Sequence, residues 1–541
     1  MKTRIIIIIL SLLFTLMSFL PSIYESLEKD KIIPERYFVL EHNYNFDYNF
    51  YLSRIREGIE GKWLITEKYF NQPHKSSLFQ AVYLYLGRVG GFFGMSVPAI
   101  YHTGRFIFGL LLLLSIAGFG RLFFKEKQLI LFFLLAATTG SWPILVRVGP
   151  DWIGVGSFWR FATYMGWWSV IDSLQRITIM PHILIGQILL VMIIRQLNDF
   201  SRLKAVKWGI AGLIAGIIFP PTIVIVYAYL FLLSVFELVE FRNLRIFVLR
   251  SILPKLIFFA VSVPSLIYAQ ISFGFQPWKA LMVFDIEHRF IMPYKEYALA
   301  LGPVLILGIL GLFFAFFYGK KIYNPAITWV LSIVMLFLVF ENVPQQSPLR
   351  FTEGLIHVPL VVLATYFLSG ILKNKLFKKL VAGSVVFMGL MVMISMVFWL
   401  TDQVKAKRES TWPVPLGAQL AYPINDFMEG IFYLKENTNV NEVVLTYITA
   451  GNYIPAYAGN YVYIGHANTP DEDEKEVIAS TFFKGEMTVE EAKKWLKQER
   501  ISYIFFGPQE RDLGGVADLK IKYDFLTPVY SNKKVVIYKI T

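Results

Sequence analysis

Residues 5–20 read IIIIILSLLFTLMSFL, an unbroken apolar run that follows Lys2 and Arg4. A helix that crosses a membrane needs about 20 consecutive, mostly apolar residues, and this run extends to about residue 24. A secretory signal peptide also begins with basic residues, but its apolar core is shorter and a small-residue cleavage site follows it. Because no such site follows here, the run predicts a membrane anchor that the protein retains.

The rest of the chain is also strongly apolar. Of its 541 residues, 55% are hydrophobic and only 17% are charged, whereas about 25% of a soluble globular chain is charged. This composition predicts a multi-pass membrane protein. Apolar windows of sufficient length predict about eleven transmembrane helices, near residues 5–24, 98–124, 128–146, 178–197, 204–219, 221–240, 246–271, 297–318, 325–341, 354–372 and 378–400.

The distribution of Lys and Arg predicts how these helices are oriented. Cytoplasmic loops of membrane proteins are enriched in these residues. If the N-terminus is cytoplasmic, every cytoplasmic connection carries a basic cluster: Lys2 and Arg4; Lys125 and Lys127; Arg195, Arg202, Lys204 and Lys207; Arg242, Arg245 and Arg250; Lys320 and Lys321; and Lys373, Lys375, Lys378 and Lys379. The same clusters account for much of the net charge of +13 without a nucleic-acid partner. We therefore expect an α-helical protein of the plasma (inner) membrane with a cytoplasmic N-terminus.

The odd number of helices then places everything after Leu400 outside the cytoplasm. Residues 403–541 change from long apolar runs to short ones, with strand-like NEVVLTYI and ISYIFFG and the amphipathic helix VEEAKKWLKQER. PVYSNKKVVIYKI reads as a terminal hairpin with its turn at Ser531-Asn532. We predict a transmembrane domain over residues 1–402, with long outer loops at 25–97 and 147–177, and an extracytoplasmic α/β domain over residues 403–541.

Asp47 is the carboxylate of greatest interest in the first outer loop. It lies in NFDYNFYLSRIREGIEGKW, where apolar or aromatic residues recur near helical spacing at Tyr48, Tyr51, Leu52, Ile55 and Ile59. The pattern predicts an amphipathic helix on the membrane surface with Asp47 at its N-cap. A solvated or capping carboxylate would explain this residue. The alternative is a general base in an aromatic setting, because a loop of this length is more often functional than a connector.

The second outer loop combines aromatic residues with ionisable ones, among them Asp151, Asp172 and Arg176. Its aromatic residues are also typical of an interfacial belt. The charged residues favour function, because ionisable groups at a membrane boundary tend to be functional. In RITIMPH, Arg176 and His182 lie at the start of the predicted fourth helix, where an arginine suits a phosphate or diphosphate.

Two further segments leave alternatives open. In SPLRFTEGLIH, Arg350 precedes a late helix, with Glu353 and His357 beyond it. Arg350 either extends to the interface to solvate its charge or binds a lipid phosphate, helped by the helix N-terminus. In the tail, YITAGNYIPAYAGNYVYIGHANT either faces an acceptor or forms the edge of a core. We favour the structural role there, including for His466.

Taken together, these motifs resemble those of the GT-C superfamily of integral-membrane glycosyltransferases. This group includes protein O-mannosyltransferases, lipid A aminoarabinose transferases and oligosaccharyltransferases. The resemblance covers most of residues 1–400 in layout. Its features are one anchor helix, the Asp-containing first loop, AVYLYLGRVGG and VPAIYHTGRF leading into the second helix, RITIMPH before the fourth, SPLRF before a late helix, and an extracytoplasmic α/β tail.

The resemblance implies an enzyme that takes its sugar from a polyprenyl-phosphate or polyprenyl-diphosphate donor outside the cytoplasm. Asp47 would be the catalytic carboxylate that binds or deprotonates a glycan, lipid or protein acceptor. Arg350 and Arg176 would neutralise the leaving phosphate, with His182 and Arg105 as further phosphate-binding candidates. A divalent cation, Mg²⁺ or Mn²⁺, would have Asp47, Asp151 and Asp172 as candidate ligands, although the first loop lacks a paired acidic motif.

Other classes of function receive less support. The sequence has no cysteine, and it lacks a Walker loop, a G-x-G-x-x-G segment before a helix and an H-E-x-x-H motif. An ion-coupled transporter would carry ionisable residues within its early helices, and these have none beyond those near the helix ends. The alternatives that remain are a lipid or polysaccharide exporter, a glycan-recognising membrane protein without catalytic activity, and a receptor-like scaffold.

Overall fold

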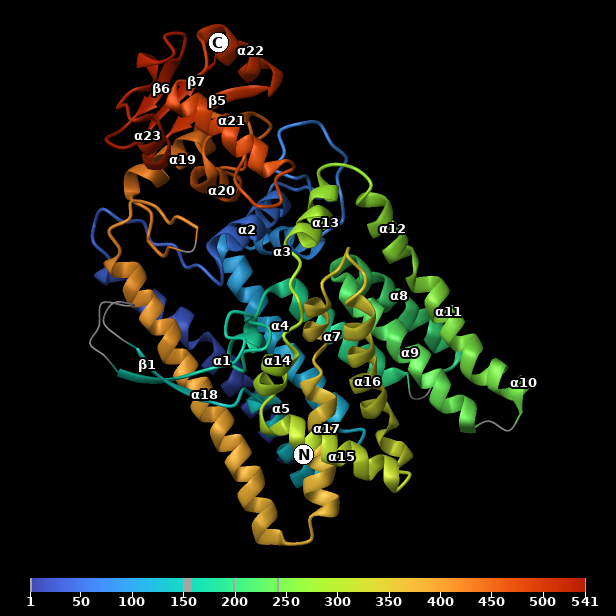
Figure 1. Cartoon of the computed structure of the whole chain (residues 1–541). Coiled ribbons are helices and arrows are strands. Elements are labelled where there is room, and N and C mark those ends of the chain that lie inside the picture. The colour runs from blue at the N-terminus through green and yellow to red at the C-terminus, as the bar shows by residue number, and fades with distance from the viewer. Residues whose placement is uncertain (1, 149–157, 198–199, 241–242, 418, 541) are drawn as a thin grey trace. The chain divides into compact units, whose positions relative to one another are not determined.

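A computed structural model describes residues 2–148, 158–197, 200–240, 243–417 and 419–540 (Figure 1). The chain divides into two compact units. Unit 1 comprises Met1–Pro21, Thr103–Ile271 and Asp285–Leu400. Unit 2 comprises Ser22–His102, Ser272–Phe284 and Thr401–Thr541. By compactness, therefore, most of the first outer loop groups with the C-terminal region.

Unit 1 is almost entirely helical. Some of its helices continue into unit 2 at their ends, because the chain passes between the units several times. The helices are α1 (Lys2–Leu27), α4 (Val97–Gly120), α5 (Glu126–Thr138), α7 (Pro181–Gln196), α8 (Arg202–Ile218), α9 (Pro220–Glu240), α10 (Leu244–Phe247), α11 (Leu253–Ser262), α12 (Pro264–Ser272), α14 (Tyr294–Ala300), α15 (Pro303–Phe317), α16 (Asn324–Phe340), α17 (His357–Tyr366) and α18 (Lys375–Glu409). Short 3-10 helices η2 (Gln175–Thr178) and η5 (Pro348–Gly354) precede α7 and α17.

Among the described residues, six helices are long and apolar enough to cross a membrane, and up to eight if each bent helix pair counts as one span. The prediction of about eleven spans is not confirmed by this count. Three of the predicted spans are shorter helices: α5 has 13 residues, α7 has 16 and α8 has 17. A straight helix rises about 1.5 Å per residue, so these three fall short of a bilayer core of about 30 Å.

Local chemistry explains where several of the spans end or bend. Pro220 begins α9 directly after α8 ends at Ile218, and the two helices pack on each other. The pair α14 and α15 is bent by 93°. Gly302 lies at this bend with φ +60°, a left-handed conformation that glycine adopts without a steric penalty. The single helix predicted over residues 297–318 is therefore two.

The second outer loop contains regular structure. Strand β1 (Ile144–Val148) pairs antiparallel with β2 (Phe158–Ala162), with Ile144 opposite Ala162. The end of the helix predicted over residues 128–146 is therefore wrong, because residues 144–146 belong to a strand. Phe161 exchanges hydrogen bonds with Ser395 Oγ of α18, at 3.0 and 2.9 Å, so this ribbon is fixed to a helix.

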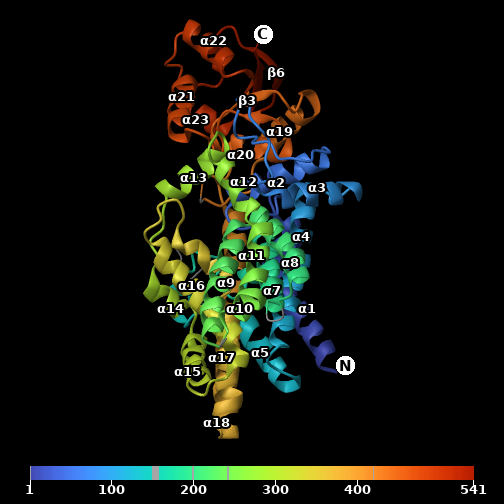
Figure 2. The same cartoon turned by 90° about the vertical axis from the view of Figure 1, so that its right-hand side faces the viewer.

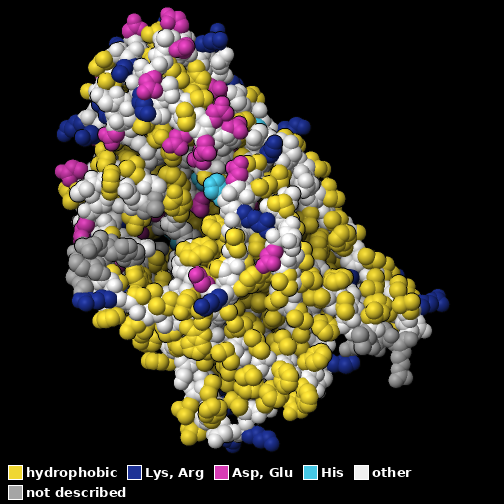
Figure 3. Space-filling model, viewed as in Figure 1, with side chains coloured by type: hydrophobic (Ala, Val, Ile, Leu, Met, Phe, Trp, Pro, Cys, Tyr) yellow, Lys and Arg dark blue, Asp and Glu magenta, His cyan; other side chains and the backbone are white. Residues whose placement is uncertain are grey.

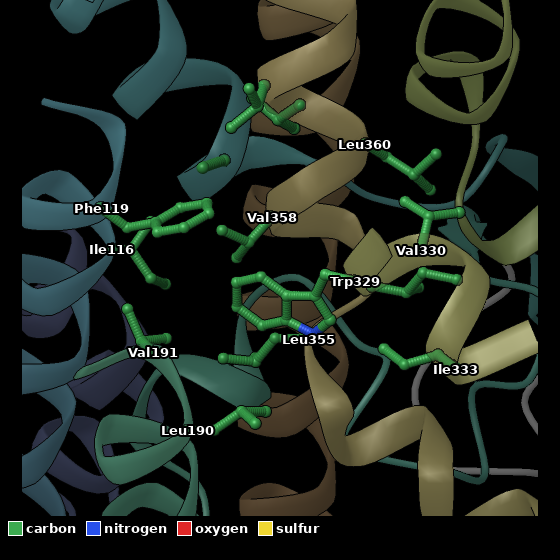
Figure 4. Close-up of a cluster of buried hydrophobic side chains, with 14 of the residues drawn as sticks. Ile116, Phe119, Leu190, Val191, Trp329, Val330, Ile333, Leu355, Val358 and Leu360 are labelled. Carbon is green, nitrogen blue, oxygen red and sulfur yellow. The ribbon is translucent and has the colours of Figure 1, made fainter. Parts of the chain in front are cut away.

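The core of unit 1 is built around Trp329 of α16. Its ring is fully buried, and its Nε1 donates to Gly354 O at 3.0 Å. Figure 4 shows the ring among apolar side chains from α4, α7 and α17, including Phe119, Val191 and Val358. All ten residues of α17 are buried, which makes it the central helix of this unit. Helix α8 packs on α7, α9 and α11, as Figure 2 shows from the side.

Unit 2 contains a five-stranded sheet in the order β4-β3-β5-β7-β6. The strands are β3 (Val443–Leu445), β4 (Tyr461–Val462), β5 (Ile501–Phe506), β6 (Thr527–Ser531) and β7 (Val536–Lys539), with helices α19 (Asn425–Asn437), α20 (Ile448–Tyr457), α21 (Glu472–Lys484), α22 (Val489–Gln498) and α23 (Pro508–Gly514). Strands β3, β4 and β5 are parallel, whereas β6 and β7 form the antiparallel terminal hairpin. The two predicted strands, the amphipathic helix and the hairpin are confirmed.

The first outer loop supplies two helices to unit 2, α2 (Asn45–Ile59) and α3 (Ala81–Phe92). They pack with their backbones in close approach, because a Cβ on Gly58 would lie 1.9 Å from Leu84 O and one on Gly87 would lie 2.0 Å from Ile55 O. The helix predicted from the apolar spacing is confirmed. The amphipathic character predicted for this helix is wrong, because polar residues on its other faces, including Asn49 and Arg54, are also buried. Its placement on a membrane surface stays a prediction.

A buried charge cluster also belongs to unit 2. Lys407, near the end of α18, lies 3.1 Å from Glu25 Oε1 and 2.7 Å from Glu41 Oε2. Tyr422 and Tyr453 donate to these same two carboxylates, at 2.9 and 2.8 Å. All three charged side chains are less than a tenth exposed. The cluster therefore joins the start of the first loop, the end of α18 and the C-terminal region.

The surfaces of the two units differ in composition. Figure 3 shows Asp and Glu side chains gathered over the α/β part of unit 2, whereas apolar side chains cover the helices of unit 1. The exposed apolar side chains of unit 1 include Phe231, Phe313 and Leu380. Large exposed apolar surfaces mark contact with lipid or with another protein.

Candidate active site

Asp47 lies in the first turn of α2. The N-cap of this helix is Tyr44, so the prediction that Asp47 itself caps the helix is wrong by three positions. A carboxylate in the first turn still faces the positive end of the helix dipole. The side chain is 49% exposed, although most of α2 is buried. Asp47 is thus a fixed carboxylate that remains open to solvent.

His466, from the segment between β4 and α21, lies against this carboxylate. Its Nε2 is 3.4 Å from Asp47 Oδ1, and its side chain is only 4% exposed. The imidazole stacks on Phe50, with ring centroids 4.4 Å apart and planes 20° apart. The ring of Tyr69 also packs against this imidazole, with the two ring centroids 5.5 Å apart. The C-terminal region therefore contributes a buried imidazole to the surroundings of Asp47.

Polar contacts hold the start of α2 in place. Asn49 Nδ2 donates to Asn452 Oδ1 of α20 at 2.8 Å, and Asn452 Nδ2 donates to Phe46 O at 3.1 Å. One turn further along, the buried Arg54 forms an ion pair with Glu67 at 2.5 Å. These contacts join buried polar groups. Losing one of them would leave a buried donor or acceptor without a partner, which would destabilise the fold. They fix the backbone on both sides of Asp47.

Tyr44 adds a second polar group at the same end of α2. Partial burial raises the pKa of its phenol, and the negative charges of Asp47 and Glu472 raise it further. The phenol therefore stays protonated at neutral pH and can donate a hydrogen bond.

The second group of predicted residues lies in unit 1 around Arg350. Arg350 Nη2 is 3.2 Å from Asp285 Oδ1, and its Nη1 is 3.8 Å from Glu353 Oε1. Its guanidinium also lies over the ring of Trp168, 5.8 Å from the centroid. The side chain is 36% exposed. Arg350 is therefore an anchored cation that still reaches solvent.

Glu353 contrasts with Arg350 in its exposure. Its side chain is 1% exposed, and neither carboxylate oxygen has a hydrogen-bond partner among the described residues. Its main-chain carbonyl accepts from Gln187 Nε2 at 2.9 Å. A buried carboxylate depends on a nearby positive charge, which here is Arg350.

The other predicted phosphate-binding residues are held mainly by unit 1 itself. Arg176 is buried and donates to Ala136 O and Ala137 O, at 3.2 and 3.4 Å, where α5 ends. Arg105 is buried too, and its Nε donates to Thr178 O at 2.8 Å. His182 is partly buried in the first turn of α7, with its ring 5.9 Å from that of Phe219. These contacts give all three residues a structural role, and their part in phosphate binding stays a prediction.

The described candidate metal ligands belong to different compact units, Asp172 to unit 1 and Asp47 to unit 2. Asp172 is buried, and its Oδ1 accepts from the main-chain N–H groups of Leu174 and Gln175, at 2.9 and 2.8 Å. Asp47 belongs to unit 2 and faces His466, and Asp151 lies outside the described residues. In the described part of the chain, no group of three or more His, Asp or Glu residues could hold a metal ion.

The structure brings together residues that the sequence did not connect. Asp47, His466 and Asn452 come from segments about 400 positions apart and belong to one unit. The sequence favours a core-edge role for His466, and the residue is indeed buried, yet it contacts the predicted catalytic carboxylate. A lone histidine carries no local signal of such a contact.

Comparison with known proteins identifies the fold. No protein-family model matches the sequence, and no curated protein matches it. Solved structures do match. The archaeal oligosaccharyltransferase AglB from Archaeoglobus fulgidus, in complex with an inhibitory peptide and a dolichol-phosphate, has a TM-score of 0.50 at 13% identity over 99% of this chain and 74% of its own.

Two further structures extend the likeness. ArnT from Cupriavidus metallidurans, bound to undecaprenyl phosphate, has a TM-score of 0.51 at 12% identity, over 99% of this chain and 97% of its own. The arabinofuranosyltransferase AftD from mycobacteria has a TM-score of 0.50 at 12% identity, over 99% of this chain and 41% of its own. All three are GT-C glycosyltransferases. Together with its apolar helices, this likeness identifies the chain as a multi-pass membrane protein with the GT-C fold.

Proposed function

We propose that this protein is a glycosyltransferase that moves a sugar from a polyprenyl-phosphate or polyprenyl-diphosphate donor to an acceptor hydroxyl. The observation that carries the proposal is Asp47, a half-exposed carboxylate fixed in the first turn of α2 within a chain of GT-C fold. The solved relatives in complex with dolichol-phosphate and undecaprenyl phosphate support the choice of donor. The acceptor is a glycan, a lipid or a protein.

In the proposed reaction, Asp47 acts as the general base. The acceptor oxygen attacks C1 of the sugar and forms a new C–O bond, while the bond from C1 to the phosphate oxygen breaks. The acceptor proton passes to the Asp47 carboxylate, and the bonding electron pair leaves with the lipid phosphate. A positioned base of this kind contributes about 10²–10⁴-fold to a rate. Positive charge near the leaving phosphate would stabilise the charge that develops on it.

We propose an orientation in the plasma (inner) membrane to match this chemistry. The N-terminus would be cytoplasmic, and the first loop and the C-terminal region would be extracytoplasmic, with about eleven spans. The Lys and Arg clusters between the predicted helices support this arrangement. Polyprenyl-linked sugars presented at the outer face would then reach Asp47 without entering the cytoplasm.

The test of the proposed function is an in vitro transfer assay. The purified full chain, reconstituted in lipid, is incubated with a panel of synthetic polyprenyl-phosphate and polyprenyl-diphosphate sugars and with extracted cell-envelope acceptors. We expect one donor class to release its polyprenyl phosphate together with a glycosylated product. Binding of the donors without turnover across the panel would contradict the proposal and favour a glycan-recognising or exporting role.

Arg350→Ala is expected to weaken donor binding more than acceptor binding. Arg350 pairs with Asp285 and Glu353, yet its side chain is partly exposed and so can reach a donor phosphate. A charge-assisted hydrogen bond to that phosphate would be worth about 1.5–3 kcal/mol. The KM for the donor should therefore rise about tenfold or more, with the KM for the acceptor nearly unchanged. The matched control is Arg289→Ala, since Arg289 donates to the main-chain carbonyls of Phe340 and Glu341. An unchanged donor KM would favour the interpretation that Arg350 only solvates its charge at the interface.

Chelation tests the proposed divalent cation. Among the described residues, no group of three or more His, Asp or Glu side chains forms a site for Mg²⁺ or Mn²⁺, and Asp151 lies outside those residues. If Asp151 or Asp172 joins Asp47 around a cation, EDTA should abolish transfer and added Mg²⁺ or Mn²⁺ should restore it. Full activity in EDTA would remove both residues from a ligand role.

A further inference from the structure

We propose that His466 is a positioning residue for Asp47, so that the C-terminal region completes the catalytic site formed on the first loop. This inference rests on the proposed function. It assigns a specific task to a residue for which the sequence alone favours a structural role. The task is to hold one carboxylate oxygen, Oδ1, so that the other can accept the proton of the acceptor hydroxyl.

The first support is the tautomer of the imidazole. His466 Nδ1 lies 3.0 Å from the main-chain N of Asn468, which donates its N–H to it. A neutral imidazole has one nitrogen that accepts and one that donates. Because Nδ1 accepts, the ring proton is on Nε2, the nitrogen that faces Asp47 Oδ1 at 3.4 Å. The main chain therefore directs an N–H donor toward the carboxylate.

The second support is the immobility of the ring. The imidazole is stacked on Phe50, which is three residues beyond Asp47 in α2. The backbone that carries the ring is also held in a turn, since Thr469 N donates to His466 O at 2.7 Å. A ring held on its face and at Nδ1 has little freedom to turn. Its Nε2 therefore stays at one place relative to the first turn of α2.

The third support is the difference in exposure between the two side chains. His466 is 4% exposed, whereas Asp47 is 49% exposed. The buried imidazole is shielded from a bound substrate, so it acts through Asp47 and not on the acceptor itself. The contact of 3.4 Å is longer than a typical N–H···O hydrogen bond of about 2.7–3.2 Å. Such contacts are often loose in free enzymes and tighten in the substrate complex.

The test compares two substitutions at this position. His466→Phe keeps the ring stack on Phe50 and removes the donor, whereas His466→Gln places an amide NH₂ near the position of Nε2. We expect His466→Phe to lower kcat about 10- to 100-fold, which is the scale of a misplaced catalytic group. The KM for the donor should stay within about twofold, and His466→Gln should recover most of kcat. A purely structural role would not distinguish a donor from a ring of similar shape.

The control variants separate the possible failures. His74 is the matched control, because it also packs against aromatic rings and its Nε2 accepts from a main-chain N–H, that of Glu67 at 2.8 Å. His74→Phe should leave kcat of the folded protein unchanged. If Asp47→Asn retains transfer, the proposed function itself fails. If Asp47→Asn is inactive while His466→Phe turns over normally, only the positioning role is overturned.

If His466→Phe does not fold, a comparison of His466→Gln with His466→Asn tests the same role. His466→Asn carries its amide near the position of Nδ1, so it cannot reach Asp47 as Gln can. We then expect His466→Gln to exceed His466→Asn in kcat by about tenfold. Equal activity of these two variants, in protein that elutes as a single folded species, would overturn the positioning role.

Discussion

Asp47→Asn is expected to reduce sugar transfer at least about 100-fold while the protein still inserts and folds. Asparagine has nearly the same shape as aspartate, and its Oδ1 can occupy the same place opposite His466 Nε2. It cannot accept the proton of an attacking hydroxyl, however. The start of α2 is held by Asn452 and by packing on α3, so the substitution leaves the local structure intact. The expected loss is therefore one of kcat and not of folded protein.

The measurement is single-turnover transfer from the donor identified in the panel, using protein of equal monodispersity. Asp30→Asn is the matched control, since Asp30 is an exposed carboxylate of the same loop and lies in a 3-10 turn. It should retain wild-type turnover. If Asp47→Asn also turns over near the wild-type rate, Asp47 is not the base.

Among the substitutions proposed for this protein, we expect Lys407→Met to lower the free energy of unfolding most. It leaves Glu25 and Glu41 buried with no cation between them, although Tyr422 and Tyr453 still donate to them. Removing one partner from a buried ion pair costs about 3–5 kcal/mol, because the remaining charge is neither solvated nor paired. We expect a marked fall in the thermal unfolding midpoint of the detergent-solubilised protein.

The same helix offers a matched control two residues away. Lys405 also pairs with a carboxylate, Asp402 at 3.1 Å, but its side chain is 36% exposed. The Lys405 ammonium reaches water, but Asp402 is only 3% exposed, so Lys405→Met removes the partner of one buried carboxylate whereas Lys407→Met removes the partner of two. We therefore expect the midpoint to fall less for Lys405→Met than for Lys407→Met. Adding Glu25→Gln and Glu41→Gln to Lys407→Met should restore part of the lost stability. Equal midpoints for Lys407→Met and Lys405→Met would show that the cluster is not the stabilising element described here.

The parts of the structure that follow from local pattern were predictable. Helix α2 follows from the spacing of Tyr48, Tyr51, Leu52 and Ile55, and the terminal hairpin follows from two strand-like runs around a turn. Spans were less predictable where an apolar run changes direction. A hydropathy window counts α14 and α15 as one helix, because the left-handed Gly302 between them is itself compatible with an apolar segment.

Only the part of the candidate site that depends on local sequence could be predicted. Asp47 could be selected from its aromatic surroundings and its position after the anchor helix. Its neighbour His466 could not, because the contact depends on tertiary structure that no short motif records. The burial of Asn49 and Arg54 was equally hidden, since a polar residue in a helix pattern normally indicates the solvent side.

The joining of the first loop to the C-terminal region has a consequence for biosynthesis. Asn49 and its partner Asn452 are 403 positions apart in the chain. At about 5–20 residues per second, synthesis of the intervening chain takes roughly 20–80 s. Throughout that time α2 lacks the partner that covers Asn49, and its buried polar groups must be satisfied by water or by another protein. Until Asn452 is synthesised, the first loop is therefore exposed to proteolysis and aggregation from which the folded protein is protected.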